Sequence, residues 1–315
     1  MVGTATLIGT RPNVIVITSG GSYIAALETI GITHRQGPFA DVQTSCALSS
    51  LEHGNVVYFP ELTLLGQESY GLLFSPALVD DKVKNISYNP GTDTIKGTIA
   101  AGRERLQLQT TMAAFSLAAT RFVAELFPSY AASLERGRAS YRPVEIADRQ
   151  YSRLKDDRLL HVDAFPSTPT QGRRILRFFS NVSSSGKSRI WHVGEPFEEF
   201  AQRFLPVLRR PRASLAWFLS AVGATRGRRT AYDQLMLGLH NRAKRDAAYQ
   251  ERAPHQKVAF PAGSNWLCFT DQVVHAAVAG QYALEQTFYL DVEAMAEPDL
   301  SPARTLERMT RRKLC

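Results

Sequence analysis

The sequence predicts an α+β protein built on one jelly-roll or cupin-like β-barrel, with a helical region before the barrel and a helical insert between its two halves. Three observations lead to this fold class. Segments of strand length form two groups of four, a block with helical periodicity separates the groups, and a long helical segment precedes them. With 315 residues, 44% of them hydrophobic and 21% charged, the chain can bury a full core and is not expected to be disordered.

The region before the barrel is expected to be mainly helical. Residues 1–40 are rich in Gly and Thr and have no clear period, so we treat them as a poorly defined lead-in. Residues 55–59 have the composition of a strand that ends at Pro60. Residues 82–98 contain Asn-Pro-Gly-Thr-Asp and are expected to form a surface connection. Apolar residues recur at helical spacing over 102–136, which predicts a helix there.

The barrel strands are predicted in two groups. The first group is expected at 141–146, 159–162, 174–181 and 188–193, and the second at 258–260, 265–270, 272–278 and 281–290. Residues 196–208 and 232–249 between the groups have a helical period, which places the insert at about 196–250. The chain is thereby divided into the lead-in 1–40, one barrel domain 41–300 and a basic C-terminal tail 301–315.

Charge and cysteine content restrict the classes of partner and compartment. Lys and Arg exceed Asp and Glu by 37 to 29, a net charge of +8 that favours acidic partners but also fits a generic basic surface. The sequence has no interleaved basic and aromatic platform, so nucleic-acid binding is not expected. Three cysteines, odd in number and without metal-binding spacing, predict reduced thiols and a cytoplasmic protein. No signal peptide or membrane span is expected.

Two segments predict a metal site. His161-Val162-Asp163 lies at the end of a predicted strand, where residues i and i+2 point to the same face, so the imidazole and the carboxylate converge. His275 lies beyond the helical insert, on a strand that enters a tight turn at Gly280. Two histidines and one carboxylate form the facial triad of non-haem Fe(II) oxygenases. An H-x-D pattern alone is a weak signal, and the combination with His275 is more specific.

The other histidines leave an alternative open. His240 is the rival ligand, but it lies in a run with helical period, where a histidine of the core or of a helix face is more common. His192 and His255 are expected to be structural or exposed.

Three longer segments resemble the 3-deoxy-D-manno-oct-2-ulosonic acid (Kdo) hydroxylases. They are Leu160–Asn181, Tyr232–Asn241 and Thr270–Phe288, within a similarity that runs from roughly Leu51 to Leu290. The resemblance implies a double-stranded β-helix and a dioxygenase that uses Fe(II), 2-oxoglutarate and O2. It further implies hydroxylation of the Kdo sugar of lipopolysaccharide (Kdo-lipid A) at C3, with release of succinate and CO2. In this interpretation His161, Asp163 and His275 are the catalytic iron ligands.

The residue that grips the distal carboxylate of 2-oxoglutarate is not evident. Many related oxygenases carry an Arg or Lys on the last barrel strand, but here the strand after Gly280 carries Gln281, Glu285 and Gln286 and no cation. A buried dianion requires a cation, which must come from elsewhere. By resemblance, the pocket for cosubstrate and sugar acid is expected to be lined by Arg142, Arg177, Arg189, Trp191 and Gln281. A surface salt bridge remains the alternative for each arginine.

A possible membrane contact lies within the insert. Two basic clusters, residues 209–212 and 226–229, flank an apolar stretch at 215–219 that contains Trp217. This pattern suits peripheral contact with an anionic membrane surface, here the cytoplasmic face of the inner membrane, and equally suits a core helix with basic ends. Kdo-containing lipid A is the expected partner, and a homo-oligomer is left open. Two other functions remain alternatives: the same chemistry on another anionic sugar acid, and a metal-free cupin-like module that binds acidic glycans.

Overall fold

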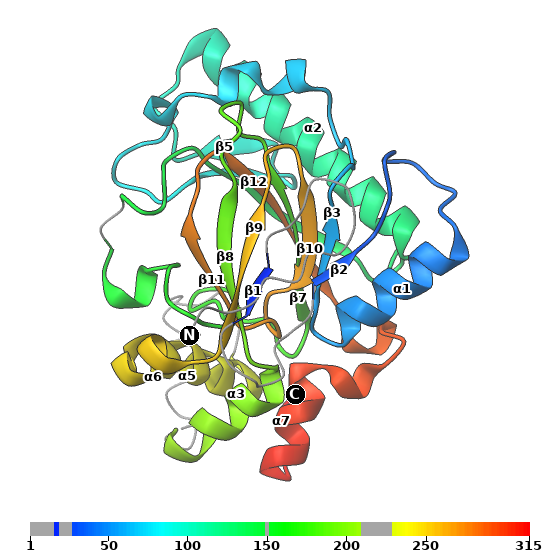
Figure 1. Cartoon of the computed structure of the whole chain (residues 1–315), viewed down its shortest axis with the longest axis vertical. Helices are drawn as coiled ribbons and strands as arrows, with labels where there is room; N and C mark the ends of the chain where they lie inside the picture. The colour runs from blue at the N-terminus through cyan, green and yellow to red at the C-terminus, as the bar shows by residue number, and fades with distance from the viewer. Residues whose placement is uncertain (1–15, 19–26, 149–150, 209–228) are drawn as a thin grey trace.

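Two β-sheets face each other at the centre of the molecule, and helices lie outside them (Figure 1). The computed structural model describes residues 16–18, 27–148, 151–208 and 229–315. Among these residues, no helix has both the length and the apolar composition needed to cross a lipid bilayer. The predicted α+β jelly-roll class is confirmed by this arrangement. The division at residues 40 and 300 stays a prediction.

Both sheets are mainly antiparallel. In the described part of the chain, the smaller sheet has the order β1 (Val16–Thr18), β9 (His255–Phe260), β8 (Arg189–Gly194) and β11 (His275–Ala279). The larger sheet has the order β2 (Leu27–Thr29), β3 (Val56–Phe59), β10 (Asn265–Phe269), β7 (Arg174–Asn181), β12 (Ala283–Leu290), β6 (Glu135–Arg142), β4 (Ile86–Asn89) and β5 (Thr94–Lys96).

Strand alternation separates two layers of core, as β7 illustrates. Phe178 points outward from the larger sheet and contacts Phe122 of the covering helix, with ring centroids 5.7 Å apart. Its neighbour Phe179 points between the sheets and stacks on Trp266, at 5.3 Å and an interplanar angle of 9°. Arg177 is two residues from Phe179 and therefore also faces the space between the sheets, which we call the barrel interior.

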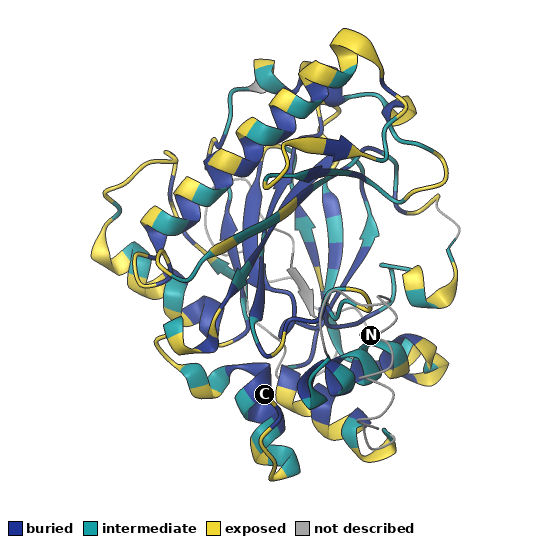
Figure 2. Ribbon diagram, turned by 180° about the vertical axis from the view of Figure 1, so that it is seen from behind, coloured by how far each residue is buried: buried dark blue, intermediate teal, exposed yellow. Residues whose placement is uncertain are grey.

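Helices cover the larger sheet and close one end of the barrel. They are α1 (Asp41–Glu52), α2 (Gly102–Leu126), α3 (Phe197–Phe204), α5 (Ala231–Arg245), α6 (Ala247–Arg252) and α7 (Pro302–Thr310). The helix α2 crosses the outer face of the larger sheet with its buried side toward the strands (Figure 2). Short 3₁₀ turns lie at Gln67–Leu73, Pro76–Leu78, Arg153–Lys155, Leu205–Val207, Val292–Ala294 and Pro298–Leu300.

The helical insert connects two strands that pair with each other. Strands β8 and β9 are antiparallel neighbours, with Trp191 opposite Val258, and α3, α5 and α6 lie between them in sequence. A capping box starts α5: the Thr230 hydroxyl accepts from the Asp233 backbone N–H at 3.2 Å, and the Asp233 carboxylate accepts from the Thr230 N–H at 2.8 Å. The predicted insert between the barrel halves is therefore observed.

Several predicted element boundaries were wrong for local reasons. The helix expected over 102–136 ends at Leu126, shortly before Pro128, and the strand expected to start at 141 starts at Glu135. The helix expected over 232–249 is two helices, because Asp246 ends α5 and caps α6 by accepting from the Tyr249 N–H.

Two predicted segments changed class. The strand expected at 159–162 is reduced to one isolated bridge, between His161 and His275. The expected surface connection 82–98 contains the hairpin of β4 and β5, which buries Ile86, Tyr88 and Ile95. Its Asn-Pro-Gly-Thr-Asp is the turn of that hairpin, so the turn was recognised but the short flanking strands were missed.

The tight turn predicted at Gly280 is present between β11 and β12. Gly280 has a φ of 109°, and a Cβ at this position would lie 2.9 Å from the Cα of Arg189. Only glycine fits both the backbone conformation and the close approach. The turn thereby packs closely against β8, the strand that carries Arg189 and Trp191.

Candidate metal centre

Three side chains predicted to bind a metal lie together at one end of the barrel interior. Possible ligand atoms of His161, Asp163 and His275 all lie within 4.8 Å of one another, and all three residues are buried. The backbones of His161 and His275 exchange two hydrogen bonds, at 3.1 and 2.9 Å, so the imidazoles lie opposite each other on adjacent segments. Asp163 is fixed by its N–H, which donates to the Thr270 carbonyl at 2.7 Å.

Both imidazoles are held in the orientation that a metal requires. The Nδ1 of His161 lies 2.7 Å from the carbonyl of Leu159, and the Nδ1 of His275 lies 2.8 Å from the carbonyl of Val273. A carbonyl only accepts, so each Nδ1 carries the proton and each Nε2 keeps a lone pair. The same two-residue geometry recurs at both sites and fixes the tautomer that leaves Nε2 free to bind a metal.

The donor set fits a divalent transition metal. The Oδ2 atom of Asp163 is buried without a hydrogen-bond donor, and Oδ1 lies 3.7 Å from the Nε2 of His161. The cation nearest to Oδ2 is the Arg177 guanidinium, whose Nη1 lies 3.4 Å away without forming a hydrogen bond, so this oxygen keeps lone pairs that a metal ion can use. Imidazole nitrogen and carboxylate oxygen on one face are the ligands of the non-haem Fe(II) facial triad.

Burial and the neighbouring charges together set the protonation states of this cluster. It lowers the pKa of His161, with a further decrease from Lys244 and His275, and it lowers the pKa of His275 against an opposing effect of Asp163. Burial alone would raise the pKa of Asp163, but Arg177, His275 and His161 outweigh it and the pKa is lowered. Neutral imidazoles and an ionised carboxylate are the forms that bind metal.

A network of ion pairs extends from the metal-site carboxylate toward the surface. Arg177 Nη1 lies 3.4 Å from Asp163 Oδ2 and 3.7 Å from Glu285 Oε1. Glu285 also receives Arg142, at 3.0 and 3.2 Å. Arg142 continues to Asp157 at 2.9 Å, and Asp157 pairs with Lys84. We call these six residues the charged network; its three cations and three carboxylates balance.

Arg189 lies outside this network and forms no ion pair among the described residues, although the carboxylates of Glu285, Asp157 and Glu145 are near enough to act on its charge. It is buried on β8, its Nη1 donates to the Gly280 carbonyl at 3.2 Å, and its Nε has no acceptor. Burial, together with the nearby charge of Arg142, lowers the pKa of Arg189 to about 10. An incompletely compensated buried guanidinium favours an incoming anion.

Trp191 connects Arg189 to the metal site along one strand face. Its indole stacks on the His275 ring, with centroids 5.1 Å apart and an interplanar angle of 22°. Arg189 is two residues away on the same buried face of β8, a distance of about 7 Å along a strand. The indole N–H of Trp191 is buried without an acceptor. The predicted side-by-side placement of Arg189 and Trp191 on one strand face is therefore observed.

The remaining predicted residues have other surroundings. His240 lies beside the site, its ring 5.0 Å from that of His161, but its Nδ1 is held by the Val162 carbonyl at 2.8 Å and it does not join the three clustered ligands. His192 and His255 stack on each other at 4.1 Å. Gln281 donates to the Pro143 carbonyl at 3.2 Å, at the turn rather than between the sheets. The roles assigned to all these residues stay predictions.

Sequence reasoning missed three members of the charged network. Asp157 lies in the run Lys-Asp-Asp-Arg, which has the appearance of a solvated loop, and Lys84 lies in the segment that was expected to be a surface connection. Glu285 carried a usable signal, because it alternates with Ala283 and Thr287 on a predicted barrel strand. A carboxylate on an inward-facing strand position requires a cationic partner.

Glu285→Gln is expected to destabilise the protein by about 3 kcal/mol, because the change leaves both Arg142 and Arg177 buried with one partner fewer. Urea denaturation measures the effect. The matched control is Glu135→Gln, which removes the partly exposed pair with Arg173 and should cost less than about 1 kcal/mol. Equal effects of the two substitutions would contradict the role given to the network.

The metal-free protein is expected to lose stability as the pH falls from 7.5 to 5.5. His161, His240 and His275 have pKa values lowered by burial, so below pH 6.5 the unfolded chain binds protons that the folded chain does not. Each such group adds a slope of up to about 1.4 kcal/mol per pH unit. Urea denaturation at both pH values tests this. His240→Gln should reduce the slope, and a free energy of unfolding that is the same at both pH values would refute the explanation.

Comparison with known proteins assigns the family. A family model described as 3-deoxy-D-manno-oct-2-ulosonic acid (Kdo) hydroxylase matches residues 36–313. A comparison with the sequences of curated proteins returned no match.

Solved structures of a Kdo hydroxylase, KdoO, share both fold and sequence with this chain. KdoO is described as a non-heme Fe(II) alphaketoglutarate (2-oxoglutarate) dependent dioxygenase. Its apo structure matches with a TM-score of 0.87 and 41% identity over 91% of this chain and 97% of that chain. Its complex with alphaketoglutarate and Fe(III), and its complex with succinate and Fe(III), each match with a TM-score of 0.86 at the same identity and coverage. With its sheets, its buried ligand cluster and these matches, the chain belongs to the Kdo hydroxylase family.

Proposed function

We propose that this protein is an Fe(II)- and 2-oxoglutarate-dependent dioxygenase that hydroxylates the Kdo sugar of lipopolysaccharide at C3, with Kdo-lipid A as substrate. One observation carries the proposal for this chain. Two imidazoles with Nδ1 held by carbonyls and one buried carboxylate bring their ligand atoms within 4.8 Å of one another in a member of the Kdo hydroxylase family. In this proposal His161, Asp163 and His275 hold the iron.

A metal ion held by His161, Asp163 and His275 would supply the oxidation of the substrate by O2, coupled to the conversion of 2-oxoglutarate to succinate and CO2. The chain supplies position and exclusion of water. The carbonyls of Leu159 and Val273 keep both Nε2 atoms aimed at the metal, and Arg177 holds Asp163 ionised. Trp191 shields one side of His275 from solvent by stacking on it.

Arg189 is our candidate for binding the distal carboxylate of 2-oxoglutarate. Arg142 and Arg177 are already paired with carboxylates of the charged network, whereas Arg189 has only a backbone carbonyl. Because the network is balanced, Arg189 and the metal are left to compensate incoming anions. Arg189 lies two residues from Trp191 on the same face of β8, and Trp191 stacks on His275, so Arg189 would hold the far carboxylate of this dicarboxylate.

Two finer features belong to the same proposal. We infer that the protein acts at the cytoplasmic face of the inner membrane, because the cosubstrate and ferrous iron are cytoplasmic. We also infer that it contacts anionic lipid peripherally through the basic clusters at 209–212 and 226–229. The segment 209–228 lies outside the described residues; Arg229, at its edge, donates to the Pro166 carbonyl. Vesicle binding that survives charge reversal at Arg209, Arg210, Arg228 and Arg229 would refute the contact.

The proposal is tested by two measurements on the purified protein. Anaerobic addition of Fe(II) and 2-oxoglutarate should produce a weak visible charge-transfer band, which a metal-free glycan-binding module would not give. Succinate release should then rise on addition of a Kdo-containing lipid A precursor. If the band appears and the protein turns over another sugar acid but not the Kdo lipid, the proposed chemistry would stand and the proposed substrate would be rejected.

A further inference from the structure

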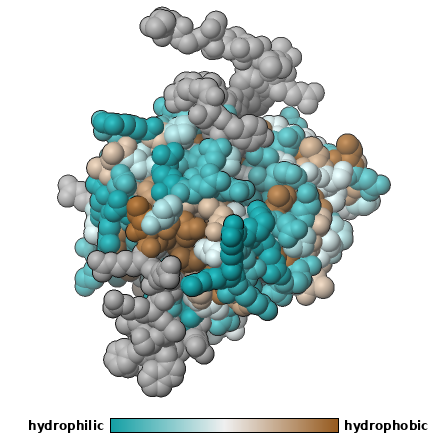
Figure 3. All heavy atoms as spheres, turned by 90° about the horizontal axis from the view of Figure 1, so that it is seen from below, coloured by the Kyte–Doolittle hydropathy of each residue, from teal (hydrophilic) through white to brown (hydrophobic). Residues whose placement is uncertain are grey.

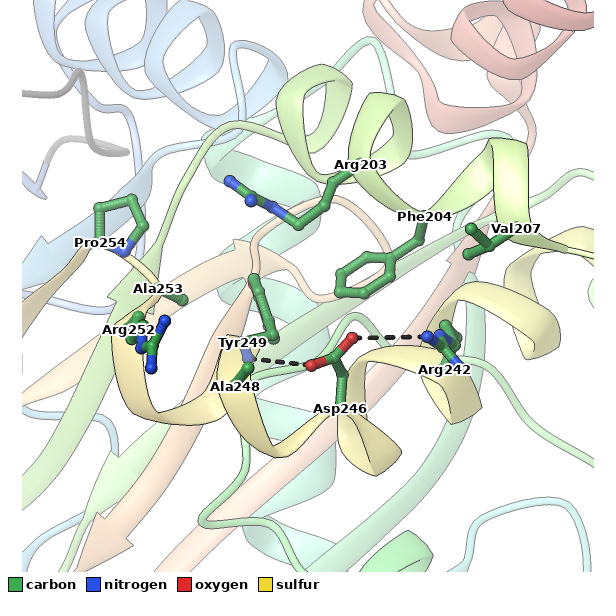
Figure 4. Close-up of a pocket in the computed structure, with 10 residues that line it drawn as sticks. All are labelled: Arg203, Phe204, Val207, Arg242, Asp246, Ala248, Tyr249, Arg252, Ala253 and Pro254. Carbon is green, nitrogen blue, oxygen red and sulfur yellow. Dashed lines mark hydrogen bonds and ion pairs between the residues drawn. The ribbon is translucent and has the colours of Figure 1, made fainter.

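A pocket on the helical insert has no role in the chemistry described so far. It has a volume of about 360 Å³ and lies between the end of α3, the end of α5, and α6 with the start of β9. Arginines from three elements surround it: Arg203, Arg242 and Arg252 (Figure 4). Phe204, Val207 and Tyr249 supply its apolar wall.

The pocket lies on the outer side of the helices that support the metal site. On α5, His240 contacts the metal-site histidine, whereas Arg242 is two residues away and therefore points to the other side of the helix. On α6, the Gln250 side chain bonds both backbone groups of Leu160, next to His161, while its neighbour Tyr249 lines the pocket. The pocket is thus a second site, separated from the metal centre by about one helix diameter, roughly 10 Å.

Its charges divide the pocket into two halves. Arg242 pairs with Asp246 at 3.6 Å, and this carboxylate also caps α6, so one side is nearly neutral. On the other side, Arg252 has no ion pair or hydrogen bond of its side chain within the described ranges. Arg203 lies over the Tyr249 ring at 5.7 Å and reaches only the buried Glu195, at 3.5 Å.

Glu195 is shared between two partners. Its Oε1 faces Arg203, while its Oε2 accepts from the Tyr249 hydroxyl at 3.0 Å. Two guanidinium groups line one side of the pocket, and one of them lies over the Tyr249 ring. With an apolar and nearly neutral half beside them, they are suited to an anion that is carried on an apolar molecule. Arginine binds phosphate bidentately and is less strongly hydrated than lysine, which favours this choice of ligand.

We propose that this pocket binds a phosphate group carried on a lipid, through Arg203 and Arg252, with the attached apolar part against Phe204 and Val207. Figure 3, which views this end of the molecule from below, shows several groups of hydrophobic residues, the largest of them bordered by hydrophilic ones. The ligand is either a phosphate of the lipid-linked sugar substrate or the head group of a bilayer phospholipid. The first source rests on the proposed function; the second does not.

The direct test is calorimetric titration of inorganic phosphate, in low salt, into protein saturated anaerobically with Fe(II) and 2-oxoglutarate so that the metal site is filled. Ala248 lines the pocket at an exposed position of α6, so Ala248→Glu adds a negative charge there while every arginine is kept. Ala248→Gln is the uncharged control of the same size. We expect phosphate affinity to be about five- to tenfold lower in Ala248→Glu than in Ala248→Gln.

A second pair of variants removes the charges themselves. Arg203→Gln/Arg252→Gln should also lose phosphate affinity about tenfold. Its control, Arg103→Gln/Arg121→Gln, lowers the net charge equally at exposed positions of α2. Equal phosphate affinities in each variant and its control, or no phosphate binding by the unmodified protein, would overturn the proposal.

Two further arms identify the source of the phosphate. If the substrate supplies it, the KM for the phosphorylated lipid substrate should be higher in Ala248→Glu than in Ala248→Gln, while a phosphate-free Kdo fragment shows no such difference. If the bilayer supplies it, cosedimentation with phosphatidylcholine vesicles containing phosphatidylglycerol should be weaker in Ala248→Glu instead. Absence of turnover in the unmodified protein would count against the proposed function, but the phosphate titration would still decide the pocket.

Discussion

Asp163→Ala is expected to reduce succinate formation to below about one-thousandth of the unmodified rate, the largest effect of any single substitution in this protein. The change removes the only carboxylate among the three clustered ligands and leaves Arg177 without its partner at the metal site. With that carboxylate absent, two neutral imidazoles alone hold the divalent ion, while the positive charge of Arg177 remains beside it.

The measurement is succinate release at saturating Fe(II) and 2-oxoglutarate, together with the stoichiometry of bound metal. Asp163→Asn preserves the shape of the side chain, so a loss of activity in this variant would be due to the lost ligand charge and not to a change in packing. Asp156→Ala is the matched control, because Asp156 pairs with Arg158 and is not among the clustered ligands. Full turnover by Asp163→Ala would refute the assignment of the metal site.

Arg189→Gln is expected to raise the KM for 2-oxoglutarate about a hundredfold, with a much smaller effect on the KM for the sugar substrate. Loss of one charge-assisted pair in a buried site corresponds to about 2–5 kcal/mol, and a hundredfold change to about 2.7 kcal/mol. The KM of Arg189→Lys for 2-oxoglutarate should lie between those of the unmodified protein and Arg189→Gln, because a single ammonium retains the charge but not the bidentate geometry.

Stability separates this binding role from a structural one. Arg189 is buried and forms no ion pair among the described residues, so its removal should leave the metal-free protein equally stable or more stable in urea. A structural arginine would give the opposite result. Arg138→Gln, at an exposed position of β6, serves as the control. An unchanged KM for 2-oxoglutarate in Arg189→Gln would show that another cation binds the distal carboxylate.

The sequence located most of the barrel and the elements of the metal site. Two groups of strands, the insert between them and the turn at Gly280 were predicted and are present. The errors occurred where local signals are weak: the short strands β4 and β5, and the segment around His161, which pairs with β11 by a single bridge. A segment of this kind has no period of its own, because its conformation is set by the strand it meets.

What the sequence determined by itself is the set of chemical groups and the strand face on which each one lies. On β8, the alternation of Arg189 with Trp191 follows from the two-residue period of an extended chain. Only the tertiary structure decided which groups meet: His275 opposite His161, Glu285 between two arginines, and Arg189 without a carboxylate. Such pairings depend on the register between distant strands and on burial, and both are fixed only when the two sheets close around a common core.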